Sequence, residues 1–397
     1  MKNIFLYILI ILYSSLLKSD DLKSYKIIFL DITNDLSYSK WGIHPVDIRS
    51  NLKKEKRALA GAKLAIQDSK KLRRLTKTDF ILKHKRVKDI NQAFKFIESE
   101  SVNSYDAVLL DLRVTNVEKL IKILNKKSKI IFFNISDPNN DLRKKVCLKN
   151  YLSSYPSYKM LTDSLSQYLI KKKLNKTLML TGPLPSDLKM STSFKESAEK
   201  FGLRIIKENF FVNNNDPRVR DKNNLSYLTK EKRYNNVFVS DTNGEFALSV
   251  QNATIRPALV SGSSGLVPRA WHWSYLRHGA PQLNGRFERM NNRRMEGKDW
   301  AAWISIKTIV ESVLRIQDIS NNNILTFINS NKIQIDGSKG ISLNYRNGTN
   351  QLRQTILLTS SNNWVTAKAP LNEFQNSDNN LDTIGLTLNE TQCGKEE

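Results

Sequence analysis

The amino-acid sequence predicts an α/β protein with two successive lobes, each a parallel β-sheet covered by helices. From residue 25 onward, short apolar runs alternate with stretches whose apolar residues recur at helical spacing. This alternation is typical of parallel sheets with helices on both faces. It pauses over residues 137–149 and then resumes, in a chain of 397 residues that is long enough for two domains. We therefore interpret the pause as the passage from one lobe to the next.

The first lobe is expected to consist of short buried strands and amphipathic helices. The helices follow from periodicity: in the first of them, Ala58, Leu59, Ala62, Ala65 and Ile66 share one face. The strands follow from apolar runs that are too short to form helices. Strands are expected at residues 26–30, 79–83, 107–110 and 129–133, and helices at residues 56–68, 90–97 and 117–124.

The second lobe repeats this arrangement. Its first helix has Met160, Leu161, Leu165 and Leu169 on its apolar face. The charged, Asn-rich residues 213–233 are interpreted as a long surface loop. Further elements are expected as strands at residues 177–180, 203–206, 237–240 and 258–260, and as helices at residues 192–201 and 244–251.

The last part of the chain changes character. A strong helix is expected from Asp299, with Asp299 as its N-cap and Trp300 and Trp303 facing the core. The polar tail from Gln375 is expected to be ordered only in part. Between them, β-strands are expected at residues 333–335, 341–345, 355–359 and 364–367.

The N-terminus indicates export. Lys2 is followed by an apolar stretch at residues 4–17, which is too short to cross a bilayer comfortably. We interpret residues 1–24 as a secretory signal peptide, cleaved near Ser19 or Ser24, and expect a periplasmic mature protein. The alternative is an uncleaved N-terminal anchor.

Charge and cysteine content leave alternatives open. The net charge of +25 is compatible with an anionic partner, but the lysines are spread along the whole chain, so we expect no nucleic-acid ligand. A basic cleft that binds an acidic ligand remains an option. The two cysteines, Cys147 and Cys393, have no metal-ligand spacing. They could form a disulfide in an oxidising compartment, or Cys147 could be a buried thiol.

The segment at residues 267–303 has the most distinctive composition. It contains four of the six tryptophans, together with His272, His278 and a cluster of arginines. If residues 270–275 are extended, Trp271 and Trp273 share a face on which a ligand or the other lobe could pack, with His272 on the opposite face. The two histidines lack a third ligand in the sequence, so no metal site is expected.

Several carboxylates fall at or just after expected strand ends, where ligands of open α/β sheets bind. Taken singly, each could equally cap a helix or form a turn. The small-residue loop at residues 262–265 could present backbone N–H groups to an anion or be an ordinary loop. No motif of a catalytic nucleophile, phosphate loop or zinc hydrolase is present, so no enzyme and no cofactor are expected. The carboxylates are Asp31, Asp35, Asp111, Asp137 and Asp241.

Several segments resemble one protein family. GAKLAIQD at residues 61–68 resembles the first helix of type I periplasmic solute-binding proteins of the Leu/Ile/Val-binding class. YDAVLLDL at 105–112, residues 137–150, and above all residues 270–288 and 293–303 look like one subfamily, the ABC-transporter substrate-binding proteins associated with PQQ-dependent alcohol dehydrogenase systems. The resemblance implies two Rossmann-like lobes joined by a hinge, with a C-terminal β segment.

The resemblance also implies function and partners. A monomer would bind a small ligand between its lobes and present it to an inner-membrane ABC permease, with a PQQ-dependent dehydrogenase as a further partner. The alternative is a periplasmic sensory or accessory protein on the same scaffold. Residues 25–137 with 268–322 would form lobe 1, residues 138–267 with 323–390 would form lobe 2, and residues 391–397 would form a tail.

The ligand itself is not indicated. Amino-acid-binding members carry small hydroxyl-rich loops, whereas here residues 111–116 and 134–141 read DLRVTN and NISDPNND. A branched-chain amino acid is therefore not expected, and an acidic quinone, an alcohol-derived compound and a metal ion remain open. The expected ligand-binding residues are Asp31, Asp111, Asn134, Asp137, Asp241, Trp271, His272 and Trp273.

Overall fold

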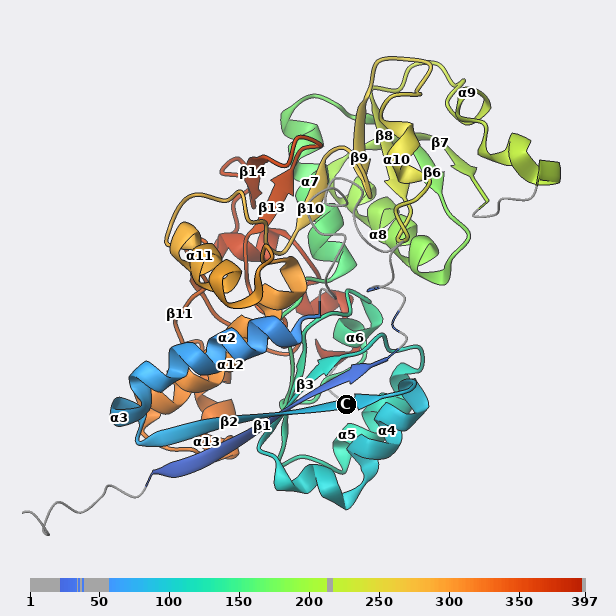
Figure 1. Ribbon diagram of the computed structural model, residues 1–397. Helices are drawn as coiled ribbons and strands as arrows, with labels where there is room; N and C mark the ends of the chain where they lie inside the picture. The colour runs from blue at the N-terminus through green and yellow to red at the C-terminus, as the bar shows by residue number, and fades with distance from the viewer. Residues whose placement is uncertain (1–21, 34, 36–37, 39–56, 213–216, 395–397) are drawn as a thin grey trace, which may run out of the picture.

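The computed structural model describes residues 22–33, 35, 38, 57–212 and 217–394. It shows two α/β lobes, one below the other in Figure 1, and the chain crosses between them more than once. Residues 1–21, which make up most of the expected signal peptide, lie outside the described residues. No described helix has the length and hydropathy required to cross a membrane.

The first lobe contains a five-stranded parallel sheet in the order β2-β1-β3-β4-β5. Along β1, Tyr25, Ile27 and Phe29 enter one core, whereas Ile28 and Leu30 enter the other. This alternation requires helices on both faces of the sheet. The strands are β1 (Lys23–Ile32), β2 (Thr78–Val87), β3 (Ala107–Asp111), β4 (Ile131–Asn134) and β5 (Tyr151–Ser153).

One face of this sheet packs against a 20-residue helix and its neighbours, and the other against helices of nine residues or fewer (Figure 1). Asp89 and Asn116 cap two of the shorter helices, because their side chains accept hydrogen bonds from Gln92 N and Lys119 N. The first group is α2 (Leu59–Ser69), η3 (Lys70–Leu72), α3 (Arg73–Thr76), α11 (Ala280–Asn291), α12 (Gly297–Ile316) and α13 (Asn321–Asn329). The second group is α4 (Ile90–Glu98), η4 (Glu100–Ser104), α5 (Val117–Asn125) and α6 (Asp141–Lys144).

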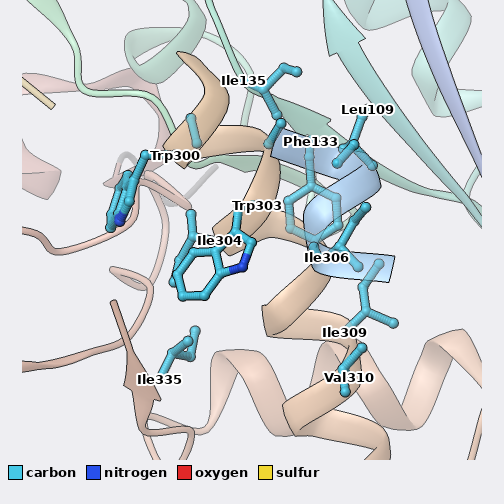
Figure 2. Close-up of a cluster of buried hydrophobic side chains, with 14 of the residues drawn as sticks. Leu109, Phe133, Ile135, Trp300, Trp303, Ile304, Ile306, Ile309, Val310 and Ile335 are labelled. Atoms are coloured by element: carbon cyan, nitrogen blue, oxygen red, sulfur yellow. The ribbon is translucent and has the colours of Figure 1, made fainter. Parts of the chain in front are cut away.

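Helix α12 is the centre of the first core. Trp300 and Trp303 are buried there with Leu109 and Phe133 of the sheet, which confirms the predicted packing of both rings (Figure 2). The expected cap is wrong by three residues. Glu296 is the N-cap, and Asp299 is the third helical residue, whose carboxylate accepts the Glu296 N–H at 3.0 Å. The short Gly297–Lys298 stretch had no apolar residue to mark it as helical.

The second lobe contains a four-stranded parallel sheet in the order β7-β6-β8-β9. Helices α7 and α8 cover one face, and α9 and α10 contribute to the core on the other. The expected surface loop contains a short helix, α9, in its described part. The elements are α7 (Tyr158–Lys171), β6 (Lys176–Thr181), α8 (Pro185–Phe201), β7 (Arg204–Phe210), η5 (Pro217–Asn223), α9 (Leu225–Leu228), β8 (Asn236–Ser240), α10 (Ala247–Val250) and β9 (Leu259–Gly262).

The late β segment forms two separate pieces. An antiparallel sheet in the order β10-β13-β14 packs beside α7, and β11 pairs with β12 near α12. After β14 the tail continues through three 3₁₀ turns as far as residue 394, so it is ordered further than its polarity suggested. The pieces are β10 (Val267–Arg269), β11 (Ile335–Asp336), β12 (Ser342–Leu343), β13 (Ile356–Thr359), β14 (Val365–Ala369), η6 (Asn380–Thr383), η7 (Leu388–Glu390) and η8 (Gln392–Gly394).

The lobe boundaries fall later in the chain than the sequence suggested. Strand β5 pairs with β4 and therefore extends the first sheet beyond residue 137. Residues from α13 to Leu352 also pack in the first core, because Ile324, Ile335 and Leu343 are buried with α12. The chain thus passes into the second lobe after β5 and again before β13.

A disulfide joins Cys147, which follows α6, to Cys393 near the end of the described chain. Their Cα atoms are 5.2 Å apart, although 246 residues separate them in sequence. The tail between β14 and Cys393 also packs on α7, where Asp163 Oδ2 accepts the Gly385 N–H at 2.8 Å. The disulfide and this contact together hold the tail across both lobes.

Candidate functional site

The carboxyl end of β1 is occupied by an internal ion-pair cluster. Asp31 is fully buried, and both of its oxygens accept hydrogen bonds from Arg86, with distances of 3.0–3.2 Å. His84 Nε2 lies 3.0 Å from Asp31 Oδ1, and Arg57 Nη1 lies 3.8 Å from Oδ2. The protein's own cations therefore surround this carboxylate, and it is more suited to fixing the strand end than to contacting a ligand.

Asp111 at the end of β3 is arranged differently. Its Oδ2 accepts a hydrogen bond of 2.7 Å from the Tyr38 hydroxyl, whereas Oδ1 is buried and has no hydrogen-bond partner among the described residues. Burial raises the pKa of Asp111, although the nearby Lys298 acts in the opposite direction. Burial also raises the pKa of Tyr38 well above its ordinary value, and the charge of Asp111 adds to this effect. Tyr38 is therefore a neutral phenol that donates to Asp111, and the Ser136 hydroxyl lies close enough to this carboxylate to lower its pKa as well.

Two cations contact the Tyr38 ring. Lys298 Nζ lies 4.2 Å from the ring centroid and the Arg57 guanidinium carbon lies 4.6 Å from it, both within the range of cation–π attraction. Burial lowers the pKa of Lys298, which Asp111 partly offsets. These contacts hold Tyr38, which follows β1, against the start of α12 and the end of β3.

Arg113 extends this group toward the passage between the lobes. Burial disfavours its charged form, yet the neighbouring Tyr158 and Asp137 raise its pKa above the ordinary value. Burial likewise raises the pKa of Tyr158 to about 12, with Arg113 acting in the opposite direction. Burial raises the pKa of Tyr155, and the charges of Arg113 and of Arg269 on β10 act in the opposite direction. The Arg113 guanidinium also hydrogen-bonds to the Tyr158 side chain, so it joins the loop after β3 to the start of α7.

Asn134 and Asp137 serve the loop that contains them. Asp137 accepts the Val114 N–H at 2.8 Å and the Asn139 N–H at 3.0 Å, and Asn134 Oδ1 accepts the Asp137 N–H at 2.9 Å. The buried Arg143 donates to the carbonyls of Asp137 and Asn139. These bonds fix the loop after β4 beside Arg113, so both predicted residues support the site rather than projecting free groups into it.

Asp241, after β8 in the second lobe, is also used internally. Its Oδ2 accepts the Ala247 N–H at 2.9 Å at the start of α10, and burial raises its pKa. The loop at residues 262–265 packs close to the sheet, and a side chain on Gly265 (φ +71°) would overlap the Val260 carbonyl. Ser263 Oγ accepts the Asp241 N–H at 2.9 Å. Asp241 and this loop therefore stabilise each other.

The three predicted aromatic and histidine positions have different environments. Trp271 is 1% exposed, stacks on Trp300 with ring centroids 6.1 Å apart, and donates from Nε1 to Asn284 Oδ1 at 3.0 Å. His272 is 3% exposed, and its Nδ1 lies 2.8 Å from Ser274 Oγ. Trp273 is partly exposed, and the Arg294 guanidinium stacks on its ring, 3.4 Å from the ring centroid. The structure thus places Trp271 in the first core, and His272 and Trp273 at its border.

His272 gives a pH-dependent prediction. Burial, followed by the charges of Arg269 and Arg294, lowers its pKa from 6.5 to about 3. The folded state binds fewer protons than the unfolded state between these values, so stability is lost as the pH falls from about 6.5 toward 3. We expect the urea midpoint of His272→Gln to fall less over this window than that of the wild type. Parallel curves for the two proteins would contradict this.

The sequence missed Tyr38, Arg113 and Lys298. Arg113 could have been found, because it lies two residues after Asp111 in the loop following a strand. Tyr38 could not, since only the fold brings it to a carboxylate 73 residues away. Within the part of the chain that is described, no three His, Cys, Asp or Glu side chains are grouped as metal ligands would be. The arrangement offers hydrogen bonds, positive charge and aromatic rings to a small ligand.

Comparison with known proteins identifies the fold. No protein-family model matches the sequence, and no curated protein matches it. Solved structures do match. A periplasmic binding protein from Burkholderia mallei has a TM-score of 0.67 at 11% identity, covering 94% of this chain and 98% of its own.

Two further matches are binding proteins whose names or complexes state a ligand. An ABC-transporter solute-binding protein from R. palustris, in complex with benzoate, has a TM-score of 0.64 at 11% identity, with coverage of 87% and 95%. A Leu-, Ile-, Val-, Thr- and Ala-binding protein from Brucella ovis, in a closed conformation, has a TM-score of 0.66 at 8% identity, with coverage of 85% and 90%. The protein described here has the two-lobed α/β fold of the type I periplasmic binding proteins.

Proposed function

We propose that this protein is the substrate-binding component of an ABC transporter, which binds a small ligand between its lobes and presents it to an inner-membrane permease. The observation that carries the proposal is the group formed by Asp111, Tyr38, Lys298 and Arg113 at the carboxyl edge of the first sheet. This edge is where open α/β sheets bind ligands. Similar solved structures that are named as an ABC-transporter solute-binding protein and as an amino-acid-binding protein support the same role.

The geometry suggests how a ligand is held. Asp111 Oδ1 offers a buried acceptor for a hydroxyl or ammonium group, and Arg113 offers a cation for an acceptor oxygen. Tyr155 and Tyr158 lie on the passage from β5 to α7, so a ligand that touches them would contact both the first lobe and the hinge. Closure around such a ligand would bury it and change the surface that a permease recognises.

The role proposed here is binding rather than catalysis. The one serine–histidine contact within residues 267–303 joins Ser274 Oγ to His272 Nδ1 at 2.8 Å. The Ser274 N–H also points to this nitrogen, at 3.3 Å, and burial lowers the pKa of His272 to about 3. A base so buried and so weak is poorly suited to activating a hydroxyl at neutral pH.

We further propose a periplasmic location and a link to PQQ-dependent alcohol oxidation. The disulfide supports an oxidising compartment, and the expected signal peptide supplies the route. The link to alcohol oxidation rests on the resemblance of residues 270–303. We expect PQQ or a carboxylic acid derived from an alcohol to raise the melting temperature, because a ligand that binds only the folded state stabilises it.

The experiment begins with native mass spectrometry of protein purified from the periplasm, followed by a thermal-shift screen with the compounds that it identifies. We expect Arg113→Met and Tyr38→Phe to weaken binding of the ligand about tenfold or more, the range for losing a hydrogen bond to a charged group. Arg289→Met, on the exposed side of α11, is the matched control and should bind normally. Wild-type affinity in both site variants would overturn the proposed site.

A further inference from the structure

Two neighbouring buried N–H groups in the Trp-rich segment at residues 267–303 have no acceptor among the described residues. The Ser274 N–H points to His272 Nδ1 at 3.3 Å, so Nδ1 is the acceptor nitrogen and the ring proton of neutral His272 is on Nε2. His272 Nε2 and Trp273 Nε1 are both buried and lack a hydrogen-bond partner among the described residues. The two ring centroids are 5.3 Å apart, so both donors belong to one small region of the molecule.

Two arginines, Arg294 and Arg269, lie near these donors. The Arg294 guanidinium lies 3.4 Å from the Trp273 ring centroid. Arg269 of β10 donates from Nε to Thr359 Oγ1 at 3.1 Å, which fixes the position of its guanidinium. The charges of both arginines act on His272. Two neutral N–H donors and two guanidinium groups thus occupy one border of the first core.

We infer that His272 Nε2–H, Trp273 Nε1–H and the guanidinium of Arg294 form a binding site for a small oxyanion, with Arg269 supplying additional positive charge. The suitable ligand class is a carboxylate, phosphate or sulfate group, whose oxygens accept several N–H bonds at once. The site goes beyond the proposed function, because it depends on groups separate from Asp111, Tyr38 and Arg113.

The two unpaired donors favour a bound acceptor. Buried N–H groups in proteins are nearly always paired, because a buried donor without an acceptor loses its bond to water and gains nothing. Adjacent arginines would repel a cation and attract an anion. A bound oxyanion would satisfy both donors and offset the mutual repulsion of the two arginines, whereas a water molecule would satisfy the donors only.

The test uses Trp273→Phe, which removes the N–H and keeps a ring for Arg294 to stack on. The probes are sodium phosphate, sulfate, acetate and benzoate, each titrated at constant ionic strength and followed by calorimetry and by melting temperature. We expect at least one of these anions to bind the wild type, and its dissociation constant to rise about tenfold or more in Trp273→Phe. Comparison of phosphate and sulfate with acetate and benzoate identifies the preferred head group. Trp364→Phe, at an exposed tryptophan, is the matched control and should bind as the wild type does.

A second variant covers the case in which Trp273→Phe fails to fold. Arg294→Gln removes the charge from a partly exposed side chain and should also weaken binding of the anion. In the absence of anion, Trp273→Phe should melt at the wild-type temperature or above, because it removes an unsatisfied donor. Binding of no anion by the wild type, or equal binding by the wild type and both variants, would overturn the site. An anion whose binding is weakened by Arg113→Met but not by Trp273→Phe would belong to the transport site at Asp111 and Arg113.

Discussion

Replacing both Cys147 and Cys393 by serine is expected to lower the free energy of unfolding by about 2–5 kcal/mol. The two residues are 246 positions apart, so their link closes a very long loop in the unfolded chain and restricts it strongly. Urea unfolding at neutral pH, followed by circular dichroism, measures the loss.

The control for this prediction is chemical reduction. Dithiothreitol should destabilise the wild type by a similar amount and leave the double serine variant unchanged. A wild-type protein whose unfolding curve is insensitive to complete reduction would contradict the prediction, and thiol titration before unfolding would verify that reduction was complete.

Arg293→Met is expected to destabilise the protein by about 3–5 kcal/mol, because it leaves Asp299 buried without its cation. Arg293 donates to both Asp299 oxygens at 2.7 Å and to the Arg57 carbonyl at 3.0 Å, and both side chains are nearly inaccessible. Burial raises the pKa of Asp299 even with Arg293 present. Without the arginine, Asp299 would be protonated more readily, so the loss should be smaller in acid than at neutral pH.

Arg286→Met provides the comparison. Arg286 also pairs with an aspartate, Asp68, at 3.2 Å, but both of these side chains are partly exposed to water. Solvent screening limits such a pair to about 1 kcal/mol or less. Equal losses in Arg286→Met and Arg293→Met would mean that burial of the Arg293–Asp299 pair has no special cost. The double variant R293M/D299N should recover part of the stability, because it removes the orphaned carboxylate.

The regular part of the fold could be predicted from local patterns. Strand β1 has buried residues on both faces, which a run such as KIIFL indicates directly. Strand β5 was missed because it is only three residues long and belongs to the first sheet solely through its pairing with β4. Helix α11 was missed because its buried residues, Ala280, Leu283 and Phe287, are few among arginines and asparagines.

The site was only partly predictable, for a physical reason. A strand end can be read from sequence, so Asp31, Asp111, Asn134 and Asp241 were correctly placed at or just after strand ends. How each carboxylate is bonded depends on partners distant in sequence. Arg86 donates hydrogen bonds to both oxygens of Asp31, whereas Tyr38 donates to only one oxygen of Asp111. Helix α7 shows the same limit, since the buried Asp163 is satisfied by Lys159, Lys200 and the Gly385 N–H of the tail.

The C-terminal tail has a consequence for motion. On the second lobe, Asp163 of α7 accepts the Gly385 N–H and Lys200 of α8 donates to the Thr383 carbonyl at 3.1 Å, so the tail is held against these two helices. Cys393 then ties the end of the tail to Cys147 beside the first sheet. If the lobes open about a hinge, as the proposed function requires, they must stretch or peel this segment, and the tail would limit the opening angle. A smaller opening would leave fewer open conformations to abandon on closure and would reduce the entropy lost when a ligand is captured.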